Sequence, residues 1–182
     1  MSLPPDDYEI LHRGRYIRMV RRNGWEYIEQ EGASGVVVLV AVTDDRRLLL
    51  VEQFRTPLQG RVIELPAGLV GDRPGFGDES FSTAALRELE EDTGYTAESL
   101  SPLLAGPYSP GRSNAFYTFM RAHGLRQISE GGGDEHEAIE VHRVPLDQIE
   151  HWLANQVALG RLVDPKIYAA LYFIGKESTA SP

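Results

Sequence analysis

The 182-residue sequence contains no cysteine. This absence excludes disulfide bonds, zinc sites built from thiolates and a cysteine nucleophile, and it fits a protein of the reducing cytoplasm, which is the expected location. The five histidines are scattered and none is paired at the spacing of helical metal ligands, so a histidine-based zinc site is not expected either. The first residues also lack the basic and apolar regions of a secretory signal peptide.

Long apolar runs and positive charge are scarce as well. The longest apolar run covers residues 35–42 (GVVVLVAV) and is far shorter than the roughly 18 residues of a membrane helix. Lys and Arg number 18 against 27 Asp and Glu, which gives a formal net charge of -9. Because nonspecific nucleic-acid binding depends on basic side chains, neither a nucleic acid nor a membrane is an expected partner. A small phosphorylated substrate is compatible with this charge if metal ions and local arginines offset it.

The length of the chain and its pattern of strand and helix segments predict one α+β domain spanning 1–182. Alternating apolar and polar residues predict an N-terminal antiparallel hairpin, with strands at 15–22 and 25–31 joined by Asn23-Gly24. Further strands of a mixed sheet are expected at residues 35–42, 48–54, 62–65, 99–104, 115–122 and 138–144. A helix is expected around residues 146–153, and Asp164-Pro165 is typical of the start of a last helix.

Within this domain the sequence predicts three kinds of segment. Residues 8–34 hold the N-terminal strands, and residues 35–176 hold the core that carries the motifs described below. Residues 1–7 and 177–182 show no periodicity and are expected to be loose termini.

An acidic helix is predicted within residues 79–95 (ESFSTAALRELEEDTGY), with Ser80 as its N-cap and Gly94 at its end. Glu88, Glu91 and Asp92 stand at offsets of zero, three and four, so they share one helical face. Like charges on one face repel, and Mg²⁺ takes carboxylate oxygens together with water and phosphate oxygens. The spacing therefore predicts a metal-binding helix.

This stretch closely resembles the Nudix box. The box reads glycine, five residues, Glu, seven residues, then Arg-Glu-apolar-any-Glu-Glu-any-Gly-apolar, and Glu79 together with residues 87–95 (RELEEDTGY) matches most of its fixed positions. The resemblance implies a Nudix-type α/β/α sandwich and a hydrolase that uses Mg²⁺ or Mn²⁺. It also implies that Arg87 pairs with Glu79 and orients the acids, which places Glu79, Arg87 and Glu91 among the expected catalytic residues.

The expected metal ligands are Glu88, Glu91 and Asp92, helped by the backbone carbonyl of Ala67 or Gly68. Two departures from the box stand out. Asp92 replaces a glutamate, and ten residues rather than five separate Gly68 from Glu79. The loop before the helix therefore carries an insertion, which loops tolerate thermodynamically.

Beyond the box, the chain resembles the ADP-ribose and ADP-sugar pyrophosphatase branch of the family. Residues 51–55 (VEQFR) with 63–68 (IELPAG), and residues 109–114 (SPGRSN), carry this likeness. It implies that Arg55 contacts substrate phosphate and that Glu64 helps to hold the substrate.

Residues 134–141 (DEHEAIEV) resemble the acidic loop that supplies a catalytic glutamate in this branch. The register with the following strand favours Glu137, and Glu135 is the alternative. The resemblance further implies a homodimer in which Tyr16 and Trp25, from different subunits, enclose the adenine. Gln30 stands where the branch usually has an arginine.

The expected activity is hydrolysis of ADP-ribose or a related nucleoside diphosphate sugar to AMP and a sugar phosphate. The alternatives are the same chemistry on GDP-mannose, a dinucleotide or an oxidised nucleoside triphosphate, or a ligand sensor without turnover. The stretches at 64–68 and 109–114 weigh against triphosphates, and the retained acids weigh against a sensor.

Overall fold

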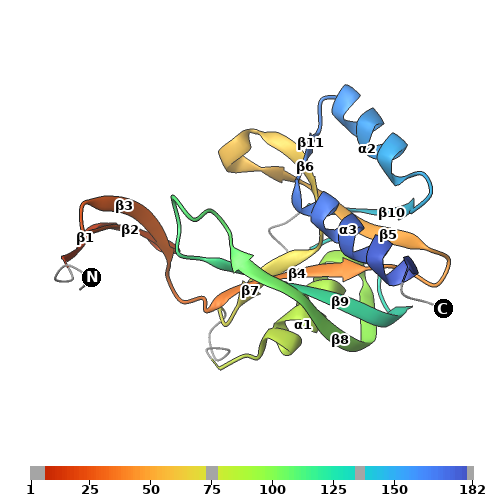
Figure 1. Ribbon diagram of the computed structural model, residues 1–182, viewed down its shortest axis with the longest axis horizontal. Helices are drawn as coiled ribbons and strands as arrows, with labels where there is room; N and C mark the ends of the chain where they lie inside the picture. Colours follow the sequence, from red (N-terminus) through yellow and green to blue (C-terminus); the bar gives the residue numbers. More distant parts are fainter. Residues whose placement is uncertain (1–6, 73–77, 134–137, 180–182) are drawn as a thin grey trace.

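The computed structural model describes residues 7–72, 78–133 and 138–179, and Figure 1 shows how their strands and helices are arranged. A small sheet at the N-terminus stands to one side of a larger body. The body contains two four-stranded sheets and three helices among the described residues. The fold is α+β, as the sequence predicted.

The N-terminal sheet has the order β1-β2-β3, with β1 at Tyr8–Arg13, β2 at Ile17–Arg22 and β3 at Trp25–Gln30. The predicted hairpin between β2 and β3 is confirmed, because Asn23 (φ 52°) and Gly24 (φ 78°) take the left-handed turn conformation that matches strand twist. Strand β1 was not predicted. It pairs with β2 from Tyr8 opposite Arg22 onward, so order begins earlier than the expected start of the hairpin.

The body is built on two mixed sheets. The first has the order β10-β5-β6-β11, and its strands are Glu140–Pro145, Arg47–Arg55, Gly60–Glu64 and Leu162–Val163. The second has the order β7-β4-β9-β8, and its strands are Ala67–Val70, Gly35–Ala41, Phe116–Gln127 and Tyr95–Pro107. Strands β4 and β9 and strands β6 and β11 are parallel neighbours, and the other pairs are antiparallel.

Helices cover these sheets from two sides. Helix α1 (Phe81–Thr93) lies on one side, and α2 (Ile149–Ala158) and α3 (Lys166–Thr179) lie on the other (Figure 1). Successive strand residues point to opposite faces, so Leu49 packs in the cluster that contains Leu89 of α1 while Leu50 packs with Leu153 of α2. Among the described residues, no helix is both long and apolar enough to cross a membrane.

Several predicted boundaries differ from the structure, among them the end of β9, which reaches Gln127 rather than 122, and α2, which spans Ile149–Ala158 rather than 146–153. Residues Ala67–Val70, for which no strand was predicted, form β7, because β4 offers them an antiparallel edge. Strand β8 runs from Tyr95 to Pro107, well beyond the predicted 99–104, because it pairs with β9 along its length. Helix α3 continues to Thr179, and Arg121 of β9 binds Glu177, so the expected loose segment 177–182 begins inside an ordered helix.

Candidate active site

Helix α1 holds the acidic residues in a fixed orientation because both of its ends are capped. The Ser80 hydroxyl accepts a hydrogen bond from the backbone N–H of Thr83, and Gly94 (φ 76°) ends the helix in the left-handed conformation. Ala85 and Leu89 are fully buried against the sheets. The opposite face of the helix, with Glu88 and Glu91, therefore points away from the core.

Arg87 is the centre of an ionic network on this helix. Its Nε and Nη2 atoms each lie 3.1 Å from one carboxylate oxygen of Glu79, so the pair that the sequence suggested is present. Its Nη1 atom donates to Glu88 at 2.6 Å and lies 3.4 Å from Glu91, and Nη2 also donates to the carbonyl oxygen of Leu69 at 3.1 Å. Burial alone would lower the pKa of Arg87, but Glu79 and Glu88 outweigh this effect and raise it. The guanidinium thus stays charged and connects three acids to β7.

Strand β7 brings the chain before the helix against the acids. The backbone N–H of Ala67 donates to Oδ2 of Asp92 at 3.2 Å. A Cβ atom on Gly68 would lie 1.9 to 2.2 Å from the Glu88 carboxylate, so only glycine leaves room for this carboxylate. Ala67, Gly68 and the three acids are therefore gathered in one place, as expected for a metal site with oxygen ligands.

A cavity of about 1050 Å³ opens beside this group. Glu88, Glu91 and Asp92 line it together with Ala67 and Gly68. Its other walls are formed by the N-terminal sheet, β5, β6, the 108–117 region and the first residue of α3. The cavity is large enough for a nucleotide-sized ligand.

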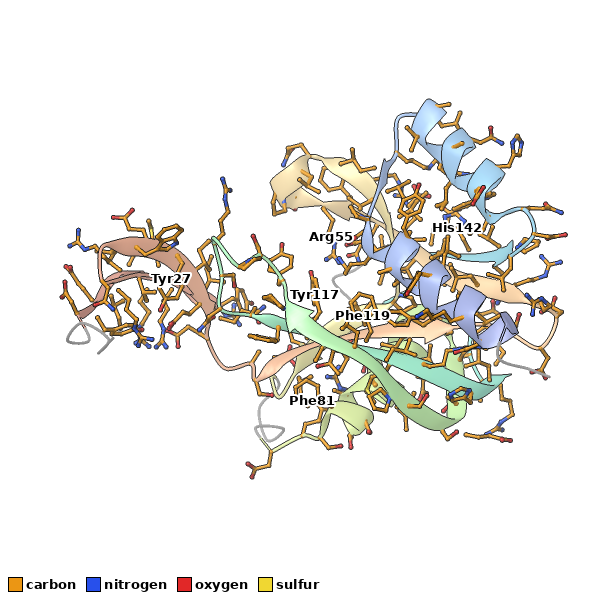
Figure 2. All side chains as sticks on the ribbon, in the orientation of Figure 1. Tyr27, Arg55, Phe81, Tyr117, Phe119 and His142 are labelled. Atoms are coloured by element: carbon orange, nitrogen blue, oxygen red, sulfur yellow. The ribbon has the colours of Figure 1, made fainter. Side chains whose placement is uncertain are left out.

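Arg55 and Glu64, at the ends of β5 and β6, line the same cavity. They are paired by a 2.6 Å hydrogen bond from Nε of Arg55 to Oε2 of Glu64. Figure 2 shows Arg55 and Tyr117 near one another in the region between the β5–β6 and β8–β9 hairpins, and Tyr117 also lines the cavity. The structure thus brings the predicted phosphate-binding arginine to the cavity that holds the predicted metal ligands.

Glu135 and Glu137 lie outside the described residues. The residues before them, however, are attached to the end of α1, because the N–H groups of Gly132 and Gly133 donate to the carbonyl oxygens of Asp92 and Glu91 at 3.1 and 3.0 Å. After the gap, Ile139 donates to the carbonyl oxygen of Gly132 at 3.1 Å. Both flanks of the acidic segment are therefore fixed beside the helix that carries the acids.

Tyr16 and Trp25 are not brought together. They occupy opposite ends of the β2–β3 hairpin, since Ile17 pairs with Gln30 and Arg22 pairs with Trp25. At roughly 3.3 Å per residue they are about 20 Å apart along the strands. Both are largely exposed, and of the described residues of this sheet Ile17, Ile28 and Gln30 line the cavity whereas Tyr16 and Trp25 do not.

Several cavity residues were not predicted from the sequence. Tyr108, Tyr117 and Lys166 come from the segment before β9, from β9 and from the start of α3, whereas Arg112 lies in the 109–114 stretch that carried the resemblance but no assigned role. Burial raises the pKa of Tyr117, and the neighbouring Tyr108, Asp164 and Glu64 add to this effect, so the phenol stays protonated. For Lys166 the local signal was its position directly after the Asp164-Pro165 start of the last helix.

A second acidic group lies elsewhere, on the face of β5 and β10. Glu52, Glu140 and His142 offer ligand atoms within 4.8 Å of one another. Glu52 is already bound by Arg61, by Arg161 at 2.9 Å and by His142 at 2.9 Å. Because two arginines compensate its charge, this group has less need of a cation than the acids of α1.

Comparisons with known proteins agree with this geometry. The family model described as NUDIX domain matches residues 33–169. The chain is 39% identical over 116 residues to the ADP-ribose pyrophosphatase of Bacillus subtilis (strain 168), a match that covers 62% of this chain and 59% of that protein, less than two thirds of its length. It is also 39% identical over 189 residues to the ADP-sugar pyrophosphatase of Mus musculus, covering 88% of this chain and 82% of that protein. A crystal structure of an ADP compounds hydrolase superposes with a TM-score of 0.70 at 24% identity, covering 97% and 95% of the two chains, and it supports the same fold.

Proposed function

The chain belongs to the NUDIX domain family, and from this premise we propose that it is a metal-dependent hydrolase of ADP-ribose or a related nucleoside diphosphate sugar, releasing AMP and a sugar phosphate. The observation that carries this proposal is the shared cavity, in which the acids of α1 face the Arg55–Glu64 pair. The names of the two relatives described above, an ADP-ribose and an ADP-sugar pyrophosphatase, support the substrate class.

The residues present fit a hard divalent cation. Glu88, Glu91 and Asp92 provide oxygen donors on one cavity wall, Gly68 leaves space for the Glu88 carboxylate, and the backbone of Ala67 lies against Asp92. When bound there, Mg²⁺ or Mn²⁺ would neutralise the diphosphate and lower the pKa of the attacking water. In this proposal Arg87 and Glu79 keep the three acids in place. Mg²⁺ is the expected metal, and Mn²⁺ is the alternative.

Arg55 is proposed to bind a phosphate group of the substrate. A guanidinium has five N–H donors, so its bond to Glu64 leaves others for phosphate oxygens. Glu64 then fixes the orientation of Arg55 and offers a carboxylate to the neighbouring part of the substrate. Both residues hold the diphosphate against the acids of α1.

We propose that Glu137 takes the proton of the attacking water, with Glu135 as the alternative. What supports this assignment is the anchoring of Gly133 to the carbonyl oxygen of Glu91, which keeps the start of the acidic segment next to the metal-binding face. Glu137→Gln is expected to reduce kcat by about a hundredfold or more. If Glu135→Gln alone has this effect, Glu135 is the base.

The adenine is proposed to lie between Tyr16 of one subunit and Trp25 of another in a homodimer. The separation of the two residues along the hairpin supports this arrangement, because one chain cannot place both on the same ring.

The absence of cysteine supports a cytoplasmic location, and the acidic composition supports a small-molecule substrate rather than a nucleic acid.

The test is release of the nucleoside monophosphate (AMP from the ADP-sugars, GMP from GDP-mannose) from ADP-ribose, ADP-glucose, GDP-mannose, a dinucleotide and an oxidised nucleoside triphosphate, each with Mg²⁺, Mn²⁺ or a chelator. We expect the ADP-sugars to be cleaved fastest and the chelator to abolish turnover. Glu88→Gln and Glu91→Gln should each lower kcat by about a thousandfold. Glu90→Gln is the matched control, because Glu90 lies on the same helix but is exposed. Binding of ADP-ribose without AMP release would favour a ligand sensor instead.

A further inference from the structure

A second cavity, of about 630 Å³, continues from the first. The two cavities share the side chains of Arg55, Pro57, Glu64, Tyr108, Tyr117 and Lys166. Its remaining walls come from Leu58, Val62, residues 162–163 of β11 and the two residues before α3. The acids of α1 line only the first cavity, so the second is a side chamber that adjoins the first at these shared residues.

The charged groups of this chamber come in pairs. Glu64 is bound by Arg55 at 2.6 Å, and Asp164 forms an ion pair with the ammonium group of Lys166. The Asp164–Lys166 pair carries no net charge, so beyond the phosphate assigned to Arg55 the chamber gives little attraction for a further phosphate. The carboxylate oxygens and N–H groups of both pairs, however, are acceptors and donors side by side, and this combination suits neighbouring hydroxyl groups, each of which both donates and accepts.

Aromatic rings form another part of the wall. Tyr108 and Tyr117 meet edge to face, with ring centroids 4.9 Å apart. The Lys166 ammonium lies 4.7 Å from the centroid of the Tyr117 ring and 3.5 Å from its hydroxyl group. The ring of Tyr117 thus holds Lys166 in place and offers an apolar surface beside polar groups, which a sugar ring with its C–H and O–H groups can use.

The position of the chamber decides which half of the substrate reaches it. Ile17, Ile28 and Gln30 of the N-terminal sheet line only the first cavity. Tyr16, proposed above to bind the adenine, directly precedes Ile17, so the nucleoside is placed at this end. A diphosphate held between the acids of α1 and Arg55 then directs its other substituent past Arg55. That substituent is the distal sugar.

We propose that this chamber is the sugar subsite, in which Asp164 and Lys166 bind hydroxyl groups of the distal sugar and Tyr117 packs against its ring. The proposal rests on the proposed function and names the part of the substrate that these residues recognise. Because small-molecule pockets of 300 to about 1000 Å³ hold ligands larger than one sugar ring, the volume also admits a hexose.

The test compares ADP-ribose with the methyl ester of ADP, in which a methyl group replaces the sugar. Lys166→Met keeps an unbranched apolar stem but removes the ammonium group, and Asp164→Asn keeps a residue able to cap α3 through the N–H of Lys166. Each variant should raise KM for ADP-ribose about tenfold or more, because it removes a hydrogen bond to a charged group. The kcat/KM for the methyl ester should stay within about threefold of wild type.

Lys176→Met is the matched control, since Lys176 lies on the same helix against Tyr172. This substitution should leave KM for ADP-ribose and kcat/KM for the methyl ester unchanged. Equal losses on ADP-ribose and the methyl ester would overturn the proposal, because they would place the nucleoside or the phosphates in the chamber. Unchanged kinetics on both would overturn it as well.

Ligand affinities measured by calorimetry test the sugar subsite independently of whether the protein hydrolyses the ligand. If the wild-type protein releases no AMP, the proposed function fails, while the affinities still report on the chamber. The subsite then requires that ADP-ribose bind more tightly than the methyl ester and that Lys166→Met remove this difference. Equal affinities of the two ligands for the wild-type protein would overturn the subsite alone.

Discussion

Glu52 is the most deeply buried acid among the described residues. Its side chain is 0% exposed, and it joins Arg61 of β6, His142 of β10 and Arg161, the residue before β11. Burial would raise the pKa of Glu52, but the hydrogen bonds from these three side chains prevail and lower it to about 2, from an ordinary value of 4.5. The carboxylate thus ties together three strands and the connection after α2.

We predict that Glu52→Gln lowers the free energy of unfolding by about 3 kcal/mol at neutral pH, because two arginines lose their charged partner. Urea denaturation measures this change. Glu140→Gln is the control, since Glu140 is 59% exposed and 3.6 Å from Arg61, and it should cost less than about 1 kcal/mol. Equal effects of the two substitutions would contradict the prediction.

The same carboxylate makes stability depend on pH. Its pKa is lower in the folded state, so its contribution is complete above pH 4.5 and is lost as the pH falls toward about 2. The shift corresponds to stability on the order of 3 kcal/mol. Wild-type stability should fall through this range, measured by denaturation at each pH, and the fall should be smaller in Glu52→Gln.

Gly68 controls the space that Glu88 occupies. We predict that Gly68→Ala weakens Mg²⁺ or Mn²⁺ binding about tenfold or more, because the new Cβ atom would lie 1.9 Å from the Glu88 carboxyl carbon and displace it. Calorimetric titration with the metal alone measures this loss. Gly111→Ala is the matched control, since its Cβ would meet nothing within 4 Å. Unchanged metal affinity in Gly68→Ala would show that the position of Glu88 is not critical.

At the scale of elements, α1 was predictable because its determinants are local. Ser80, the acids and Gly94 act within a few residues of one another, and the structure has the helix at Phe81–Thr93 as expected. Strand β7 was not predictable, because Pro66 and Gly68 suggest a turn and only the distant β4 makes these residues a strand. Tyr117 and Lys166 reach the cavity from different parts of the chain, and no short motif joins them.

The N-cap of α1 provides a prediction for this element. Ser80→Ala should lower the free energy of unfolding by about 1 kcal/mol, because the N–H of Thr83 loses its acceptor. Ser82→Ala is the control within the same turn, since Ser82 is exposed inside the helix, where alanine is favoured. Chemical denaturation of both variants gives the comparison, and a Ser82→Ala loss as large as that of Ser80→Ala would argue against the cap.

At the scale of the whole molecule, the N-terminal sheet is joined to the body at the 111–113 segment. Ile28 donates to the carbonyl oxygen of Arg112 at 2.8 Å, and Nε1 of Trp25 donates to the carbonyl oxygen of Gly111 at 3.2 Å. Figure 1 shows this sheet standing away from the helices. Exposed apolar side chains on it, such as Ile17 and Met19, support the proposed homodimer.

Mixing two variants that each weaken adenine binding tests the shared adenine site at a substrate concentration below their raised KM. Tyr16→Ala and Trp25→Ala should each raise KM for ADP-ribose strongly, because each removes one side of the base-binding site. After subunit exchange, half of the dimers are mixed and each holds one intact site, so about a quarter of wild-type activity should return. Light scattering checks the dimer mass. No recovery in a dimer that exchanges subunits would show that the two aromatics do not act across subunits.

The insertion before α1 has a consequence for how the family can diversify. Its two ends are held together, because Gly71 donates to Glu79 at 3.2 Å and Asp72 lies 3.9 Å from Arg87. When the ends of a loop are fixed by such contacts, doubling its length costs only about 0.6 kcal/mol in closure entropy. Related chains can therefore lengthen or shorten this connection during evolution while the acids of α1 keep their positions.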